Sequence, residues 1–529
     1  MDRSIVRKPD RAWMLGALAL LLVFLLGCNL ATGIKQKPTD TPQAPTQTAE
    51  LPTMTLPASS DTPAAPQEVT PTPIPPSATA EVAATETSTP VAEVPTETPS
   101  ASGQTTGSLA SNGQWLIIST SSGIWAANAD GTGLTQLSKE VVLSPTHLQQ
   151  GISPDGKSLA FVSGDADRLH HLQLSILSLP DGKVSLVTPL TSQATEPGPG
   201  ASPGDPVIEA VRAVTEGDSL AWSPDGNTLA FIGVQSGPTA DLYTYSLATQ
   251  KIDHLSDGPS QAYGPHWSPD GKYILTFGVT TFGTGAGFTM AGGWAQTPDG
   301  AQTITLFQGG GSGQEFGGWV NDHSFLINSW NPGCGSQDLR VHDLSTNQET
   351  SLVKGCFAAA AVKSDNGLIL VAGSGDGGSL KGLVSYTPPN FTRQQLSQES
   401  AQDVQYLPQD GGFVVAYQNI QTIYTGSGEA LIQSPPLQCT YTPAVAAYGA
   451  LYAWTCAKGD LGVWVNGPGV PTAKLFDQSA AFPAWSAANE LFFFNNQTLY
   501  QAPFPDYTPK VAGKIQAENI LDVAWAGQP

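Results

Sequence analysis

Short apolar runs that each follow the same turn dominate the hydrophobic pattern of this chain. The turn Ser-Pro-Asp-Gly occurs in three segments that align with one another, at 152–162, 222–232 and 267–277. Proline presets φ at the first turn position, aspartate accepts hydrogen bonds from the turn backbone, and glycine adopts the positive φ that completes the turn. The runs after the turn, such as Leu159–Val162, are continuously apolar. This pattern predicts strands that are covered on both faces.

The turn is part of a longer repeat, which recurs at intervals of roughly 45 to 70 residues. Weaker copies begin at residues 111, 364, 408 and 485, and irregular ones near Trp319 and Ala447, which makes nine repeat-like segments. A second strand and a further turn follow most copies, so that each repeat predicts four short strands, the architecture of a β-propeller blade. We therefore expect residues 109–529 to form one all-β propeller of seven to nine four-stranded blades, with eight preferred. Two packed domains are the alternative.

The last residues of the chain fit this scheme. Leu521–Ala526 has the pattern of a strand that precedes a Ser-Pro-Asp-Gly turn, but no blade follows it. We expect it to complete the first blade, because such a closure removes the free sheet edges that invite aggregation. The stretch 206–214 is compatible with a helix and lies in a Pro/Gly-rich insertion, so we expect it to decorate a loop.

Two short motifs connect the repeat to a known family. Trp-Ser-Pro-Asp-Gly-Lys at 267–272 and Asn-Ala-Asp-Gly-Thr at 128–132 resemble the WD40-like (PD40) repeats of the TolB-type β-propeller. The resemblance covers residues 109 to about 529, but it is sharp only from 111 to 280, and the turn is mostly lost beyond 315. It implies a propeller fold and a role in binding protein partners.

The N-terminus has a different pattern. Basic residues at 3, 7, 8 and 11 precede an apolar run from Ala12 to Leu26. The run is shorter than the roughly 20 residues of a membrane-spanning helix, so we interpret residues 1–27 as a secretory signal peptide rather than a permanent span. Its end, Leu25-Leu26-Gly27 before Cys28, resembles the lipobox of bacterial lipoproteins. That resemblance implies cleavage before Cys28, acylation of this cysteine, and an extracytoplasmic protein that is attached to a membrane through lipid.

Residues 28–108 connect this lipidated N-terminus to the repeats. From residue 35 onward the segment is dominated by Thr, Pro, Ala, Ser and Glu. It cannot bury enough apolar surface to offset its ordering entropy, so we expect a disordered linker. At about 3 Å per residue such a linker can span on the order of 100–200 Å and hold the folded part away from the membrane. The composition also resembles that of glycosylated stalks.

The charge of the chain narrows the choice of partners. The net charge is −22; residues 1–34 contribute +2 and residues 35–108 contribute −6, which leaves −18 on the repeat region. A surface of this sign repels nucleic acid and anionic lipid. We expect a monomer that binds an envelope or extracellular protein or glycan, and no nucleic acid. Because only 12% of the residues are charged, recognition would depend more on uncharged polar and aromatic side chains.

Four cysteines remain besides Cys28, and an even number in an exported chain predicts disulfides. Pairing of neighbours along the sequence is the simplest of three connectivities, and the candidates are Cys334, Cys356, Cys439 and Cys456. A metal site is the competing interpretation, but the chain contains no Cys-x-x-Cys pair.

The sequence has no recognisable catalytic motif. The chain contains no Gly-x-Ser-x-Gly elbow, and no segment resembles the α/β-hydrolase domain of propeller-bearing peptidases. The conspicuous aspartates are explained as turn residues; they are Asp155, Asp225 and Asp270. We expect no cofactor.

Candidate metal ligands are equally sparse. Neighbouring residues on a strand point to opposite faces, so we interpret His170 and His171 as solvated or packing side chains rather than as ligands. Asp165, Asp167 and Asp376 do not make up a full calcium ligand set. The glycine-rich stretches 283–288 and 309–313 lack the strand, helix and lysine of a phosphate-binding loop, so we expect flexible surface loops.

The tryptophans fall into two groups. One group shares a single repeat position and is expected to be core; its members are Trp222, Trp267, Trp485 and Trp525. The other group lies around the glycine-rich stretches, where exposed aromatic rings would stack on a sugar or seat a peptide; its members are Trp294, Trp319 and Trp330. Buried packing is the alternative for the second group.

The leading hypothesis is a non-enzymatic binding or scaffold module at the cell envelope. One alternative is an exported glycan-active enzyme, a hydrolase or lyase, with carboxylates in the propeller channel. Carboxyl groups about 5–10 Å apart in an open channel would favour that enzyme. A channel lined by backbone and small residues would argue against it. The other alternative is a purely structural surface protein.

Overall fold

The computed structural model describes residues 108–527, with gaps at 112, 144–147, 216–217, 283–287, 310–312, 332, 364, 376–378, 409–410, 439–443, 449, 457–458, 460 and 468–469. The expected signal peptide, lipobox and linker lie outside the described residues, as do Cys28, Asp376 and Cys439. None of the described residues belongs to a helix that is long and apolar enough to cross a bilayer.

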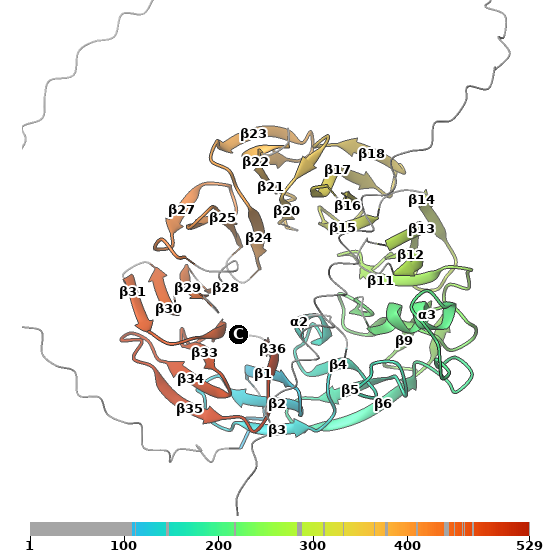
Figure 1. Ribbon diagram of the computed structural model, residues 1–529, viewed down its shortest axis with the longest axis horizontal. Coiled ribbons are helices and arrows are strands. Elements are labelled where there is room, and N and C mark those ends of the chain that lie inside the picture. Colours follow the sequence, from blue (N-terminus) through green and yellow to red (C-terminus); the bar gives the residue numbers. More distant parts are fainter. Residues whose placement is uncertain are drawn as a thin grey trace, which may run out of the picture. The chain divides into compact units, whose positions relative to one another are not determined.

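The described residues form nine antiparallel sheets arranged in a ring, which makes the domain a nine-bladed β-propeller (Figure 1). Seven sheets have four strands, one has five and one has three. The expected all-β propeller is confirmed, but the preferred number of eight blades was wrong. The nine repeat-like segments of the sequence correspond to the nine blades, including the irregular copy near Trp319, where the turn has Asn321 in place of aspartate and its Oδ1 accepts the N–H groups of His323 and Ser324 at 3.0 and 2.8 Å. Strands pair through their backbones, so a blade forms without the Ser-Pro-Asp-Gly sequence.

The first blade contains both ends of the domain. Its inner strand is β36, which pairs antiparallel with β1, so that Leu116 lies opposite Trp525 and Trp115 opposite Ala526. The expected closure by the last strand is therefore confirmed. The strands of this blade are, from the inside outward, β36 (Ile520–Ala526), β1 (Trp115–Thr120), β2 (Gly123–Asn128) and β3 (Thr135–Ser138).

Blade two differs from the others on its inner side. Its sheet has only the strands β4 (Ser158–Ser163), β5 (Gln173–Ser178) and β6 (Lys183–Pro189). The short helix α2 (Leu148–Gly151) and a single bridge between Ile152 and Leu159 take the place of the inner strand. Figure 1 shows α2 on the inner side of the ring, and it contacts β36 of blade one and the inner strand of blade three.

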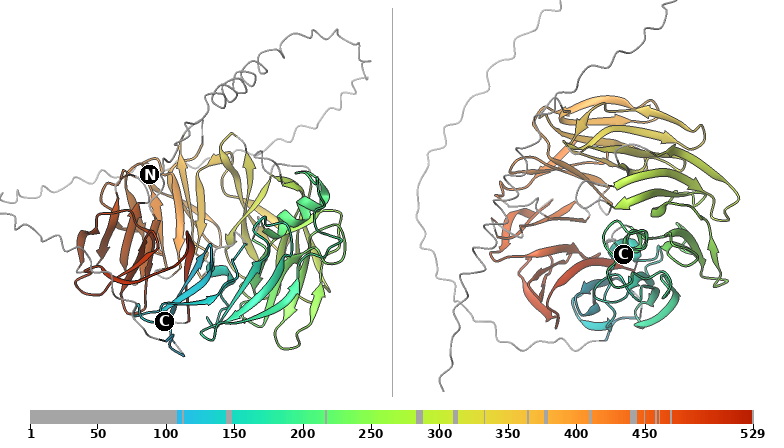
Figure 2. Two further views of the ribbon diagram at one scale, coloured as in Figure 1. Left: turned by 60° about the horizontal axis from the view of Figure 1, so that its bottom comes forward. Right: turned by 45° about the vertical axis from the view of Figure 1, so that its right-hand side comes forward.

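The helix α3 (Pro206–Thr215) precedes blade three, as the helix-compatible stretch predicted. It is more than loop decoration, because its apolar face joins the core beneath it; the buried residues include Ala210, Val211 and Val214. Figure 2 shows α3 in green against blades three and four. Those blades comprise β7 (Leu220–Trp222), β8 (Thr228–Gly233), β9 (Asp241–Ser246) and β10 (Ile252–His254), then β11 (Gln261–Trp267), β12 (Ile274–Phe282), β13 (Phe288–Gln296) and β14 (Thr303–Gln308).

Blades five and six follow the regular pattern, except that a short fifth strand, β19, pairs with β17 in blade five. A disulfide joins Cys334 to Cys356, with Cα atoms 6.0 Å apart, which confirms this predicted pair. The strands are β15 (Gln314–Trp319), β16 (Ser324–Asn331), β17 (Gly335–Asp343), β18 (Gln348–Ser351) and β19 (Cys356–Phe357), then β20 (Ala359–Val362), β21 (Ile369–Ser374), β22 (Lys381–Thr387) and β23 (Thr392–Ser397).

Blades seven to nine complete the ring. Cys456 is fully buried at the end of β29. Since Cys439 lies outside the described residues, the pairing of these two cysteines stays a prediction. The strands are β24 (Asp403–Leu407), β25 (Gly412–Ala416), β26 (Gln421–Tyr424) and β27 (Ala430–Gln433), then β28 (Ala444–Tyr448), β29 (Leu451–Cys456), β30 (Gly462–Gly467) and β31 (Val470–Phe476), then β32 (Ala481–Trp485), β33 (Leu491–Asn495), β34 (Thr498–Ala502) and β35 (Lys510–Lys514).

The repeated turn has the predicted chemistry. The hydroxyl of Ser153 donates to Asp155 Oδ1 at 2.6 Å, and the same oxygen accepts the backbone N–H of Lys157 at 3.1 Å. These hydrogen bonds stabilise the ionised carboxylate, so that the pKa of Asp155 is lowered although burial acts in the opposite direction. The turns at Asp225 and Asp270 repeat the hydroxyl contact at 2.5 and 2.8 Å. The three aspartates are therefore turn residues, as expected.

Candidate functional site

The tryptophans of the shared repeat position connect neighbouring blades. The indole N–H of Trp222 donates to the carbonyl of Gly151 at 2.8 Å, and that of Trp267 donates to Ala221 at 3.0 Å. Trp485 makes the equivalent bond to a residue of the preceding blade, Ala446, at 3.3 Å. All of these rings are buried, which confirms the expected core role. Each bond joins the inner strand of one blade to the inner wall of the blade before it.

Two tryptophans of the inner strands break this pattern. Trp319 in β15 and Trp525 in β36 are only 9% and 7% exposed, yet within the described structure neither indole N–H has a hydrogen-bond partner. An unpaired buried donor loses the hydrogen bond that water supplied in the unfolded chain, at a cost of about 1–3 kcal/mol. Such groups in a native structure call for an explanation, for instance a ligand that supplies the missing acceptor.

The pockets among the described residues include two on the inner side of the ring, and Trp525 lines the larger of these two channel pockets. Its volume is about 610 Å³, and its walls come from the inner strands of blades one, eight and nine, with contributions from blade seven and from α2. Apolar and small side chains predominate, and the polar groups include Gln149 and Tyr448. None of the described residues that line it is Asp, Glu, Lys, Arg or His.

The smaller pocket lies among the inner strands of blades three, four and five and has a volume of about 320 Å³. Both pockets are lined by Ile152 and Pro154, so the segment after α2 is a wall that they share. Gln149 of α2 lines the larger pocket, and the neighbouring Gln150 lines the smaller one. The unusual inner edge of blade two thus separates the two pockets.

A carboxylate and a histidine distinguish the smaller pocket from the larger one. The imidazole of His266 stacks on Phe316 with ring centroids 4.2 Å apart, and Phe316 in turn meets the edge of Trp319 at 5.9 Å. Burial lowers the pKa of His266 to about 4, although the nearby carboxylate of Asp218 acts in the opposite direction. His266 is therefore neutral at neutral pH, with one ring nitrogen as donor and the other as acceptor.

The three tryptophans proposed as binding residues do not form one site. Trp319 lines the smaller pocket. The half-buried ring of Trp294 packs over Gly278 and Gly292, where added Cβ atoms would lie 2.6 and 2.9 Å from it. Trp330 is half-buried on β16, and its backbone N–H donates to Gly313 at 2.6 Å. Neither Trp294 nor Trp330 lines either of the two channel pockets.

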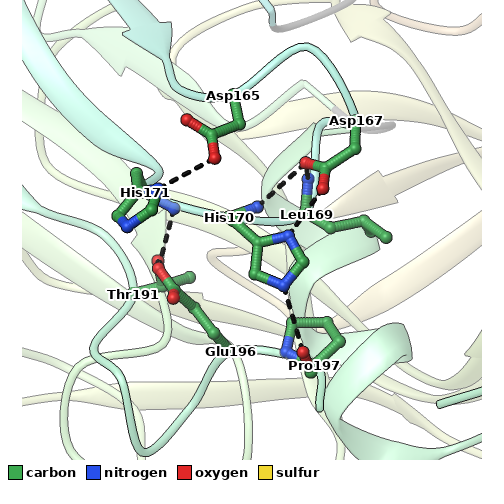
Figure 3. Close-up of polar contacts among 8 residues, drawn as sticks. All are labelled: Asp165, Asp167, Leu169, His170, His171, Thr191, Glu196 and Pro197. Carbon is green, nitrogen blue, oxygen red and sulfur yellow. Dashed lines mark hydrogen bonds and ion pairs between the residues drawn. The ribbon is translucent and has the colours of Figure 1, made fainter. Parts of the chain in front are cut away.

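The histidine pair lies in a loop rather than on a strand, so the expectation of opposite strand faces was wrong for these residues (Figure 3). His170 contacts Asp167 at 2.6 Å through Nδ1 and the carbonyl of Pro197 at 3.0 Å through Nε2. His171 Nδ1 lies 2.9 Å from Asp165. The carboxylate contacts raise the pKa of both histidines. Each imidazole is paired with a different aspartate, and no group of three or more His, Cys, Asp or Glu among the described residues is arranged to bind a metal.

Comparison with known proteins supports the repeat assignment. No family model matches the chain. A 56-residue stretch is 32% identical to the Tol-Pal system protein TolB of Alcanivorax borkumensis and covers 11% of this chain and 13% of that protein. The domain is a β-propeller, and this stretch of it is similar to TolB. A 54-residue stretch is 48% identical to an uncharacterized peptidase of Bacillus subtilis, YuxL, and covers 10% of this chain and 8% of that protein.

The propeller also matches solved structures. A crystal structure of a eukaryotic initiation factor superposes with a TM-score of 0.50 at 11% identity and covers 79% of this chain and 98% of its own. At that identity the similarity concerns the fold alone. The two sequence alignments span short parts of their proteins, so no activity follows from them, and the function has to be argued from the site.

Proposed function

We propose that this chain is an exported lipoprotein whose propeller, residues 109–529, binds an envelope or extracellular protein in its central channel. Lipid on Cys28 attaches it to the membrane, and the linker of residues 28–108 holds the propeller away from the surface. The propeller acts as a binding scaffold and not as a catalyst. Its similarity to TolB supports an envelope partner.

The larger pocket carries this proposal. It combines a volume of about 610 Å³ with predominantly apolar walls and the unpaired indole N–H of Trp525. A concave, mostly apolar surface with a few placed polar groups is the usual form of a binding site. Because α2 and the inner strands of several blades build the pocket, its shape depends on the closed ring.

The main alternative is an exported glycan-active hydrolase or lyase with carboxylates in the channel. Hydrolysis of a glycosidic bond usually needs two carboxyl groups about 5–10 Å apart. Among the described lining residues, the larger pocket has no carboxylate and the smaller one has Asp218. The geometry of these pockets therefore favours binding over glycan hydrolysis.

Photo-cross-linking tests the binding role. Replacing Tyr448, which lines the larger pocket, by p-benzoylphenylalanine in cells of the native host should give one adduct of defined mass after irradiation. The matched control places the same group at Leu186, which is 57% exposed on the outer strand β6. The control should give no adduct of that mass. Equal adducts at both positions, or none at Tyr448, would argue for the purely structural alternative.

Membrane attachment has a separate test. The substitution Cys28→Ser removes the proposed acylation site, so at least nine-tenths of the protein should move from the membrane fraction to the soluble extracytoplasmic fraction. Fractionation with immunoblotting measures this distribution. The control is Cys334→Ser, which removes a cysteine of the disulfide in blade five and should leave the fractionation unchanged. Retention of the Cys28→Ser variant in the membrane would show that lipid on this residue is not the anchor.

A further inference from the structure

The smaller channel pocket combines a single charge with aromatic walls. Of the described residues that line it, Asp218 is the only carboxylate, and the one other ionisable side chain among them, His266, is neutral at neutral pH because burial lowers its pKa to about 4. The remaining surface includes Trp222, Trp267 and Phe316. A carboxylate beside aromatic rings in a confined space is an arrangement that attracts organic cations.

The electrostatic surroundings favour the same class of ligand. Burial raises the pKa of the neighbouring Tyr263 to about 12, and the negative charges of Asp218 and Glu315 act in the same direction. The repeat region as a whole carries a net charge of −18, since residues 1–34 and 35–108 contribute +2 and −6 of the total of −22. Both the local field and the long-range field therefore attract a positive group.

Besides the carboxylate of Asp218, the indole of Trp319 is the second group of this pocket that can contact a ligand. Phe316 and Phe325 pack against this ring in edge-on geometry at 5.9 and 5.5 Å, and the side chain is buried to nine-tenths. Its faces are therefore not open for stacking a sugar, and the polar group that it offers is the unpaired N–H. In blades three and four the equivalent N–H groups, those of Trp222 and Trp267, donate to main-chain carbonyls. A peptide carbonyl is the acceptor that fits this position.

We propose that the smaller pocket binds one arginine residue of the protein partner, with the guanidinium on Asp218 and the main-chain carbonyl on the indole N–H of Trp319. A planar guanidinium lies against aromatic rings and donates two parallel hydrogen bonds to one carboxylate, whereas the lysine ammonium binds as a point charge. This inference rests on the proposed function, because it specifies one residue of the segment that occupies the channel.

A pair of capped amino acids tests the pocket. N-acetylarginine methylamide and N-acetylcitrulline methylamide have nearly the same shape, but in citrulline a carbonyl oxygen replaces one NH2 group of the guanidinium, which removes the positive charge and two of the five N–H donors. Titration of the full-length protein in detergent, followed by saturation-transfer NMR, should show about tenfold tighter binding of the arginine compound.

Three variants assign the contacts. Asp218→Asn should abolish the preference for arginine, whereas Asp181→Asn, which removes a charge from an exposed turn, should keep it. Trp319→Phe should weaken both compounds by a similar factor, because it removes the donor to the shared carbonyl. Thermal unfolding of each variant establishes that it is folded.

The inference fails if citrulline binds as tightly as arginine, or if Asp218→Asn leaves the preference intact. Those outcomes would leave the proposed function standing as long as cross-linking at Tyr448 succeeds, because Tyr448 lines the other pocket. If cross-linking at Tyr448 fails but the preference for arginine is clear, the proposed function is wrong, whereas the smaller pocket still binds arginine.

Discussion

Truncation of the chain after Asn519 is expected to abolish cooperative folding of the propeller. It removes β36, which supplies the inner strand of blade one and pairs with β1 over its full length. Trp525 of this strand is buried in the core between blades nine and one and meets the ring of Phe492 at 5.6 Å. Loss of a buried tryptophan costs about 3–5 kcal/mol, and the open edge of β1 adds to this cost. The sum approaches the roughly 5–15 kcal/mol that stabilise a typical domain.

Urea unfolding followed by circular dichroism, together with size-exclusion chromatography, measures this effect. The matched control is truncation after Gly527, which keeps β36 and removes only two residues. The control should unfold like the full chain. A cooperative transition of the shorter variant at the wild-type urea concentration would show that the ring does not depend on its last strand.

The second large effect is expected from Gly156→Ala, and the repeat provides its control. Gly156 and Gly271 occupy the same position of the Ser-Pro-Asp-Gly turn, with φ of +67° and +71°. Alanine at either position costs about 1 kcal/mol because of the positive φ. At Gly156 the added Cβ would also lie 2.2 Å from the backbone nitrogen of Gly527, whereas at Gly271 its closest neighbour is Pro224 Cδ at 3.7 Å.

We therefore expect Gly156→Ala to lower the free energy of unfolding by about 3 kcal/mol and Gly271→Ala by about 1 kcal/mol. Chemical denaturation of both variants under identical conditions gives the difference. Equal destabilisation would mean that the turn of blade two and the end of the chain are not in contact. Because Gly156 and Gly527 both line the larger pocket, Gly156→Ala should also reduce cross-linking through Tyr448.

The features that were predicted correctly depend on short stretches of sequence. The Ser-Pro-Asp-Gly turns follow from the side chains of four consecutive residues, and the buried strands follow from continuous apolar runs such as Leu159–Val162. The closing strand was recognisable because Leu521–Ala526 repeats a pattern found elsewhere in the chain. Cys334 and Cys356 are 22 residues apart in one blade, so their pairing could also be predicted from their closeness in the sequence.

The number of blades and the histidine contacts were harder to predict from the sequence. Strands pair through backbone groups that every sequence has, so a blade with the turn at Asn321 leaves only a weak mark in the sequence. The histidine pair was assigned from strand geometry. The chain forms a loop there, and its conformation depends in part on Glu196, which accepts the backbone N–H of His171 at 2.7 Å from a neighbouring loop.

The composition of the channel was decided by the tertiary structure alone. Asp218, His266 and Trp319 follow one another along the chain at intervals of about 50 residues, and they meet because consecutive blades place their inner strands side by side. The sequence placed Trp267 and Trp319 in different groups, but both lie on inner strands, and nothing in the sequence predicted that one indole N–H is paired and the other is not. An indole N–H at this position is paired only where a main-chain carbonyl of the preceding blade lies within reach. The blade before Trp319 has β11 as its inner strand, and the register of β11 is irregular between Tyr263 and His266. Residue periodicity determines which side chains face inward, whereas the contacts between blades determine which of them a partner can reach.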